Sequence, residues 1–260
     1  METLMKKTSL YFLLALIIIS IFAMWRSAKK APLAPAVETI VVGTNAEFQP
    51  FSFKEGETIT GFDIDVITEV FKRLDKEFII KDMPFDALIP EIQLGNVQVI
   101  AGGITPTKER AKRALFTEPH LTGDSLAIVS LKTGPVINSI HDLIDKNVVV
   151  NEGYTADSYM SGQQGINLVR LSSNSVSDGI LALQSNRADA FVTALRPMQP
   201  YFTSFGKDNF NILPIEGTEE SSAFAISKHH PELRDIIQIT LDRMQADGTL
   251  DELKKKWELE

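Results

Sequence analysis

The 260-residue chain contains no cysteine, and this absence excludes several classes of protein. A disulfide framework, a thiol nucleophile, a Cys-ligated zinc site and an iron–sulfur cluster all need cysteine, as does a lipid on an N-terminal cysteine. A positive charge excess is also missing, because 26 basic residues stand against 34 acidic ones, for a net charge of −8. This balance gives no support to nucleic-acid binding, for which a basic face is expected.

Catalytic motifs are missing as well. The four histidines, His120, His141, His229 and His230, do not form an HExxH pattern, and the chain has no GxSxG or phosphate-loop pattern. The motifs therefore predict no catalytic residue, no metal site and no cofactor.

The first 36 residues differ in character from the rest. They carry five basic residues and one acidic residue, so the remainder has a formal charge of −12. Lys6 and Lys7 precede an uncharged run over 8–25, the pattern of a secretory signal. Its 16-residue apolar centre would span about 24 Å as a helix, less than the roughly 30 Å hydrocarbon core.

Cleavage of this segment is left open by the sequence. The nearest small-residue triplet, Ala34-Pro35-Ala36, lies late, and Arg26, Lys29 and Lys30 follow the apolar run. We expect either a cleaved signal or an uncleaved anchor over 1–36, including a linker, and an exported body in both cases. The expected location is periplasmic or extracytoplasmic.

From residue 39 onward, predicted strands and helices alternate. Such βα units are typical of mostly parallel sheets covered by helices. The predicted strands are Thr39–Val42, Phe78–Ile80, Val97–Ala101, Leu126–Ser130, Val148–Val150, Asn167–Leu171 and Ala188–Thr193. The predicted helices are one capped by Asp63, then Phe85–Leu94, Ser139–Ile144, Ala156–Ser161 and Val176–Leu183.

Two consecutive helices are predicted at the C-terminus. Pro231 begins the first, and a Thr249–Glu252 capping box opens the second. Two helices in succession need a sheet to cover, and we expect them to return to the N-terminal sheet.

Polar, glycine-containing turns follow three of the predicted strands. They are Gly43–Phe48, Gly102–Arg110 and Asn151–Thr155. Ligands of open α/β sheets bind beyond the carboxyl ends of strands. A Gly and a Thr at a helix start suit a carboxylate, and an Arg could bind the same group with two hydrogen bonds.

At these turns the sequence resembles the polar amino-acid-binding group of periplasmic solute-binding proteins, family 3, which serve ABC importers. The matching motifs are Val41–Phe51, Gly61–Val66, Phe85–Pro90, Ala101–Arg110, Asn186–Ala190 and the tail from Asp247 to Trp257. They occur in order along nearly the whole body, and the arginine- and glutamine-binding receptors are closest in kind.

The resemblance implies an α/β fold of the type II periplasmic-binding-protein class, with two lobes joined by two hinge strands. We place the crossings near Leu121–Ser125 and Leu213–Ser221. Lobe 1 is then expected over 37–122 and 217–260, and lobe 2 over 123–216.

The resemblance also implies a set of ligand-binding residues. Arg110 falls at the carboxylate-binding position, Thr105 at a hydroxyl that contacts carboxylate and ammonium, and Gly103 at a carbonyl for the ammonium. Thr155 would complete the carboxylate site from lobe 2. The remaining implied positions are Phe48 and Phe85, which would sandwich the ligand side chain, and Asn45, which would read its polar end.

One position departs from the family. The acidic residue that usually pairs with the ligand's ammonium is replaced by Ala194. Because a buried ammonium without a carboxylate is unfavourable, another acid is expected to substitute, or the ligand is not an ordinary α-amino acid. The available acids are Glu152, beside the Thr155 loop, and Glu219 or Glu220, near the second crossing.

The sequence therefore predicts a non-enzymatic, monomeric receptor that captures a polar amino acid, with arginine favoured and glutamine next. It would deliver the ligand to an ABC permease in the inner membrane, with no nucleic-acid partner. The alternatives left open are an enzyme on the same scaffold, like a cyclohexadienyl dehydratase or a lytic transglycosylase, and an anchored surface sensor.

Overall fold

The computed structural model describes residues 20, 22, 39–173 and 175–260. The chain divides into two compact units, 1–38 and 39–260, and the elements below belong to the second. The expected signal or anchor and its linker fall almost wholly outside the described residues. Within the described part of the chain, no helix combines the length and apolar character that crossing a membrane requires.

The first five-stranded sheet has the order β5-β1-β6-β13-β7. Strands β5, β1 and β6 run parallel, and β13 is antiparallel to both β6 and β7. Its strands are β1 (Ile40–Thr44), β5 (Phe78–Asp82), β6 (Val99–Ile100), β7 (Leu115–Phe116) and β13 (Ala225–Ile226). The accompanying helices are α2 (Phe62–Arg73), α3 (Phe85–Leu94), α4 (Lys108–Ala111), α8 (Pro231–Ala246) and α9 (Thr249–Lys256).

The second five-stranded sheet has the order β10-β9-β11-β8-β12. Strands β10, β9 and β11 are parallel, whereas β8 is antiparallel to both of its neighbours. Its strands are β8 (Leu121–Leu131), β9 (Asn147–Asn151), β10 (Asn167–Leu171), β11 (Ala190–Ala194) and β12 (Phe210–Ser222). The accompanying helices are η1 (Ile140–Leu143), α5 (Thr155–Ser161), α6 (Val176–Gln184), η2 (Arg196–Met198), α7 (Gln199–Phe205) and η3 (Lys207–Asn209).

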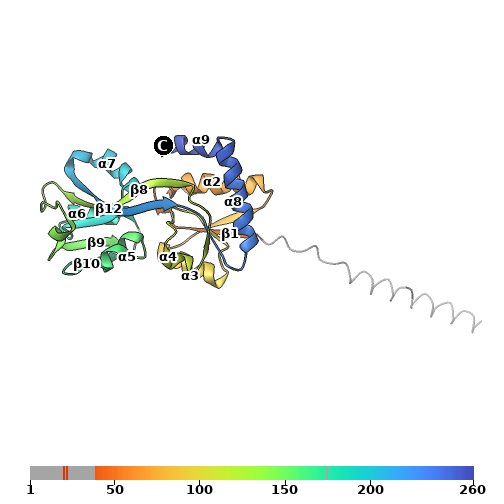
Figure 1. Cartoon of the computed structure of the whole chain (residues 1–260), viewed down its shortest axis with the longest axis horizontal. Coiled ribbons are helices and arrows are strands. Elements are labelled where there is room, and N and C mark those ends of the chain that lie inside the picture. Colours follow the sequence, from red (N-terminus) through yellow and green to blue (C-terminus); the bar gives the residue numbers. More distant parts are fainter. Residues whose placement is uncertain (1–19, 21, 23–38, 174) are drawn as a thin grey trace, which may run out of the picture. The chain divides into compact units, whose positions relative to one another are not determined.

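The long strands β8 and β12 connect the two α/β lobes (Figure 1). They pair with each other, and the register of this pair shifts between Pro214 and Glu219 and again between Glu220 and Ser222. These two antiparallel strands are the hinge strands of the predicted type II fold, and this fold class is confirmed. The lobe boundaries at 122/123 and 216/217 stay a prediction.

The first C-terminal helix, α8, packs on the first sheet, as its apolar stripe predicts, and α9 packs on α8 and α2. Helix α8 contacts β7, β13 and α2, and α9 contacts α8 and α2. The buried apolar residues of α8 recur at helical spacing: Leu233, Ile237, Leu241 and Met244. The chain thus leaves the first sheet, builds the second and returns.

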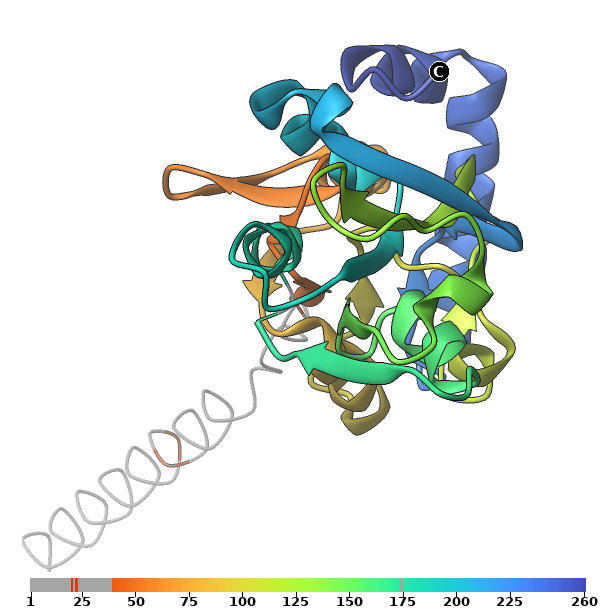
Figure 2. The ribbon, with the colours of Figure 1, turned by 90° about the vertical axis from the view of Figure 1, so that its left-hand side faces the viewer.

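Two local predictions were wrong, and one small sheet was missed. The sequence did not predict the small sheet of β2 (Glu47–Phe48), β3 (Ser52–Glu55) and β4 (Thr58–Thr60), part of which projects as an orange hairpin in Figure 2. Asp63 does not cap α2, whose N-cap is Gly61. Thr249 is the first residue of α9 rather than its cap, because Gly248 takes that place in a left-handed conformation.

Candidate functional site

The three polar turns predicted from the sequence meet where the two sheets face each other. On the side of the first sheet, a small cavity there is lined by Phe48 of β2, Phe85 of α3, Arg110 of α4, and the loop residues Gly103 and Thr105. On the other side, strands β9, β11 and β12 and the start of α5 contribute Asn151, Tyr154, Thr155, Ala156, Val192, Thr193, Ala194 and Glu220. Its volume is about 20 Å³. Six of the seven ligand-binding residues that the resemblance implies, all but Asn45, therefore line one cavity.

Arg110 is held rigidly at the cavity wall. It lies on the short helix α4, whose N-cap, Thr107, accepts a hydrogen bond from the Arg110 backbone N–H. Its Nη1 donates to the Thr105 carbonyl at 2.9 Å, and its Nη2 donates to the Gly153 carbonyl at 3.0 Å. Burial lowers the pKa of Arg110 to about 10, so the guanidinium stays charged at neutral pH. Arg110 thus connects the first lobe to a loop of the second.

Glu220 is the carboxylate at the centre of the site. Its Oε2 accepts hydrogen bonds from Thr105 Oγ1 and from Thr155 Oγ1, both at 2.9 Å. Burial raises the pKa of Glu220, while the two hydroxyl hydrogen bonds and the nearby charge of Arg110 oppose the rise. One carboxylate is therefore bound by hydroxyls from both sides of the site.

The shifted register of β12 sets which of its acidic side chains points inward. The shift between Pro214 and Glu219 resets the face on which later residues lie, and past it neighbouring side chains point to opposite faces. Glu219 is exposed, whereas Glu220 lines the cavity. Glu152 does not line the cavity; it lies in the turn after Asn151, the last residue of β9, which does line it.

The space between the predicted aromatic residues, Phe48 and Phe85, is occupied by a third ring. Tyr154, which is 6% exposed, contacts both rings, with centroids 4.3 Å from Phe85 and 5.2 Å from Phe48. Its hydroxyl donates to Asn45 Oδ1 at 3.2 Å, and Asn45 Nδ2 donates to the Met83 carbonyl at 3.4 Å. The side chain of Asn45 is therefore bound to the Tyr154 hydroxyl and to the Met83 carbonyl. The sequence signal for Tyr154 was its place in the turn between Gly153 and Thr155.

Gly103 needs to be glycine. Its φ is +73°, and an added Cβ would lie 2.8 Å from the Phe48 ring. The Gly102 and Gly103 N–H groups donate to Asp63 Oδ2 at 3.0 and 2.6 Å. Asp63 is fully buried and also contacts Ser222 Oγ and His120 Nε2. The residue predicted as a helix cap instead holds the glycine turn beside the site.

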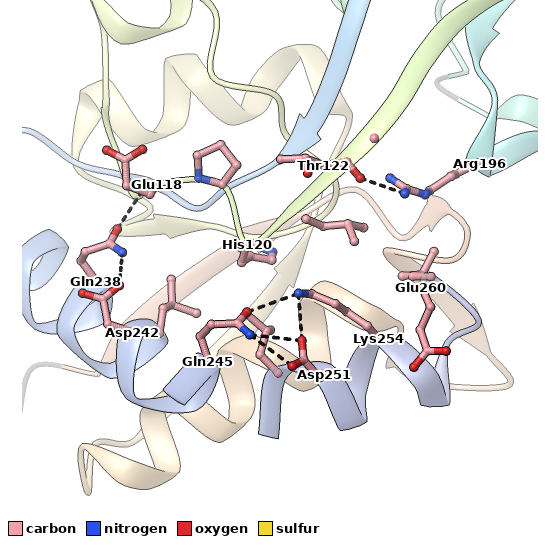
Figure 3. A pocket seen from close by; sticks show the side chains of 16 residues that line it. Glu118, His120, Thr122, Arg196, Gln238, Asp242, Gln245, Asp251, Lys254 and Glu260 are labelled. Carbon is pink, nitrogen blue, oxygen red and sulfur yellow. Dashed lines mark hydrogen bonds and ion pairs between the residues drawn. The ribbon is translucent and has the colours of Figure 1, made fainter. Parts of the chain in front are cut away.

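A larger groove lies elsewhere, between α8, α9 and the start of β8 (Figure 3). Its volume is about 730 Å³, and its polar side chains largely bond to one another. Gln238 donates to Asp242, Gln245 donates to Asp251, and Lys254 contacts both Gln245 and Asp251. None of the residues predicted from the sequence to bind the ligand lines this groove, so the smaller cavity is the candidate ligand site.

Comparison with known proteins identifies the family of the chain. Two curated relatives are the arginine-binding extracellular protein ArtP of Bacillus subtilis (strain 168) and a probable histidine-binding protein of Campylobacter jejuni. They are 29% and 30% identical, over 84% and 85% of this chain and 85% and 86% of their own lengths. An ancestral arginine-binding protein bound to arginine has a similar solved structure, with a TM-score of 0.78 and 32% identity over 84% of this chain and 97% of that one. The family model of bacterial extracellular solute-binding proteins, family 3, matches residues 40–260. The chain therefore belongs to the bacterial extracellular solute-binding proteins, family 3.

Proposed function

We propose that this family member is an extracytoplasmic receptor that closes on a free polar amino acid and delivers it to an ABC permease, without catalysing a reaction. One observation carries the proposal: hydroxyls from both sides of the site converge on one carboxylate, that of Glu220, beside the charged Arg110. Charge-assisted hydrogen bonds of this kind would also hold a ligand carboxylate. Because they come from both lobes, such a ligand would stabilise the closed form.

Arginine is the proposed ligand, with glutamine next. The rings of Phe48 and Phe85 suit a planar guanidinium or amide, and a cation gains attraction from the ring faces. Asn45 can accept from a guanidinium and can both donate to and accept from an amide. The names of two relatives, ArtP and the ancestral arginine-binding protein, point the same way.

We also propose that Glu220 replaces the acid missing at Ala194. Ala194 ends β11 and lines the cavity together with Glu220. A small turn of the Glu220 side chain would bring its carboxylate to the ligand's ammonium and free the two threonine hydroxyls for the ligand's carboxylate. The ammonium would then have the buried counter-charge that it needs.

Isothermal titration of the purified protein with L-arginine, L-glutamine and L-histidine tests the proposal. We expect Arg110→Ala to weaken binding about 100-fold, because a charged hydrogen-bonding partner of the carboxylate is lost. Arg110→Lys keeps the charge but loses the two-pronged geometry, so it should be intermediate.

Lys112→Ala is the matched control for this test. Lys112 lies next to α4, is exposed and pairs with Glu109, so its removal should leave the affinity unchanged. An unchanged affinity in Arg110→Ala, with an unchanged melting temperature, would contradict the assignment of the carboxylate site.

A further inference from the structure

The ring of Tyr154 occupies the position expected for a ligand side chain. It comes from the loop before α5, on the second lobe, and contacts Phe48 and Phe85 of the first lobe. Its hydroxyl bonds to Asn45, the residue expected to read the polar end of the ligand. An apolar ring with a polar tip thus satisfies the same partners that the ligand side chain would use.

The remaining space is too small for an amino-acid side chain. The cavity of about 20 Å³ has room for roughly one water molecule. Tyr154 is buried, as are Phe48, Phe85 and Asn45. A ligand side chain therefore cannot enter between the two phenylalanines while Tyr154 remains in place.

The position of Tyr154 depends on closure of the two lobes. The Gly153 carbonyl accepts from Arg110 of the first lobe, and the Thr155 hydroxyl donates to Glu220 on the hinge strand β12, so contacts outside their own loop hold the residues on both sides of Tyr154. Separation of the lobes would break these contacts and withdraw the ring together with its loop.

Resting on the function proposed above, we propose that Tyr154 determines specificity as a built-in occupant of the side-chain slot, which a long ligand side chain has to displace. Long planar side chains regain the aromatic contacts that Tyr154 gives up, whereas short ones do not. Tyr154 thus lowers the affinity for every ligand that uses the slot, and it stabilises closure in the absence of ligand.

Titration of the full-length chain and its Tyr154→Ser variant with L-arginine and L-alanine tests this role. We expect Tyr154→Ser to bind L-arginine at least tenfold more tightly than the unaltered chain, with the affinity for L-alanine changed less than threefold. Tyr154→Phe keeps the ring in the slot and should stay within threefold for both ligands. Tyr159→Ser, on α5 and outside the cavity lining, is the matched control and should change neither affinity. Equal or weaker L-arginine binding by Tyr154→Ser would overturn the proposal.

Small-angle X-ray scattering without ligand separates this inference from the proposed function. We expect Tyr154→Ser to be more expanded than the unaltered chain and Tyr154→Phe. If no amino acid binds any of these proteins, the proposed function fails, and the scattering alone decides whether Tyr154 holds the lobes closed. Identical profiles for all three proteins would overturn that role.

A measurement on the unaltered chain covers the case in which Tyr154→Ser does not fold. The chain has four tyrosines, so ring-labelled tyrosine gives a simple NMR spectrum, and Tyr154→Phe identifies the Tyr154 signal. Saturation with L-arginine should move this signal to the position of a solvent-exposed ring. An unmoved Tyr154 signal in the saturated protein would overturn the displacement.

Discussion

At the scale of single residues, the main feature of the site is a half-buried acid on a hinge strand. Glu220 bonds to Thr105 and Thr155, which stand 115 and 65 residues away in the chain. Ala194, where the family usually has an acid, lines the same cavity. In the function proposed above, Glu220 on β12 supplies the negative charge of the site in place of an acid at the end of β11.

The raised pKa of Glu220 predicts a pH-dependent stability. The folded state holds the proton of Glu220 more tightly than the unfolded state does. The contribution of Glu220 to the free energy of unfolding is therefore fully present below about pH 4.5 and is lost as pH rises through the raised pKa. Glu220→Gln cannot ionise, so it should be the more stable protein at pH 7, and the difference should vanish near pH 4.

Thermal unfolding of both proteins between pH 4 and pH 7 measures this effect. Arg110 and Asp124, whose charges also act on Glu220, are present in both proteins. The control is Glu219→Gln, an exposed neighbour that should follow the unaltered chain. Parallel curves for Glu220→Gln and the unaltered chain would refute the prediction.

At the scale of elements, α2 is joined to the glycine turn after β6 by Asp63. This carboxylate also contacts Ser222 at the end of β12 and His120 just before β8. One side chain therefore fixes the turn that carries Gly103 relative to both hinge strands.

Replacement of Asp63 by alanine should destabilise the fold strongly. It leaves the buried Gly102 and Gly103 N–H groups without their acceptor, so we expect the free energy of unfolding to fall by about 3 kcal/mol or more. Asp65→Ala, on the same helix, removes more accessible contacts to Lys256 and Trp257 and should cost about 1 kcal/mol. Urea unfolding measures both, and equal losses would contradict the role of Asp63.

At the scale of the whole molecule, closure brings Gly153 of the second lobe against Asp86 at the start of α3. A Cβ added at Gly153 would lie 3.1 Å from the Asp86 Cβ, close to the 3.5–4.5 Å typical of a disulfide. Because the chain has no other cysteine, Gly153→Cys combined with Asp86→Cys can form a disulfide only with each other within one molecule.

This disulfide should lock the site closed and abolish L-arginine binding, since the cavity admits no amino acid in that state. Reduction should restore binding. The binding free energy should be weaker by about 1 kcal/mol, because a side chain at position 153 strains a backbone whose φ is +77°. Titration with and without reductant checks this, with each single cysteine variant as a control. Equal binding in both redox states would show that the contact does not govern ligand entry.

Local patterns in the amino-acid sequence were enough to predict the features that depend on nearby residues. Period and turn chemistry predicted α3 as Phe85–Leu94 and β10 as Asn167–Leu171 with their observed bounds, and they placed polar turns at three strand ends. The turns after β1 and β6 lie at a common edge of the first sheet because these strands are parallel, and the turn after β9 meets them because the second sheet faces the first. Arg110, Thr105 and Thr155 therefore line one cavity.

The identity of the side chains that fill that cavity depends on contacts made in the folded chain. A strand residue's orientation depends on a bulge set by its partner strand, so the sequence left Glu152, Glu219 and Glu220 equivalent as candidates. The ring of Tyr154 reaches the slot because a loop of one lobe closes against the other, and Asp63 is buried by segments distant in the chain. Such contacts join residues that are far apart in the sequence, so no local sequence pattern predicts them.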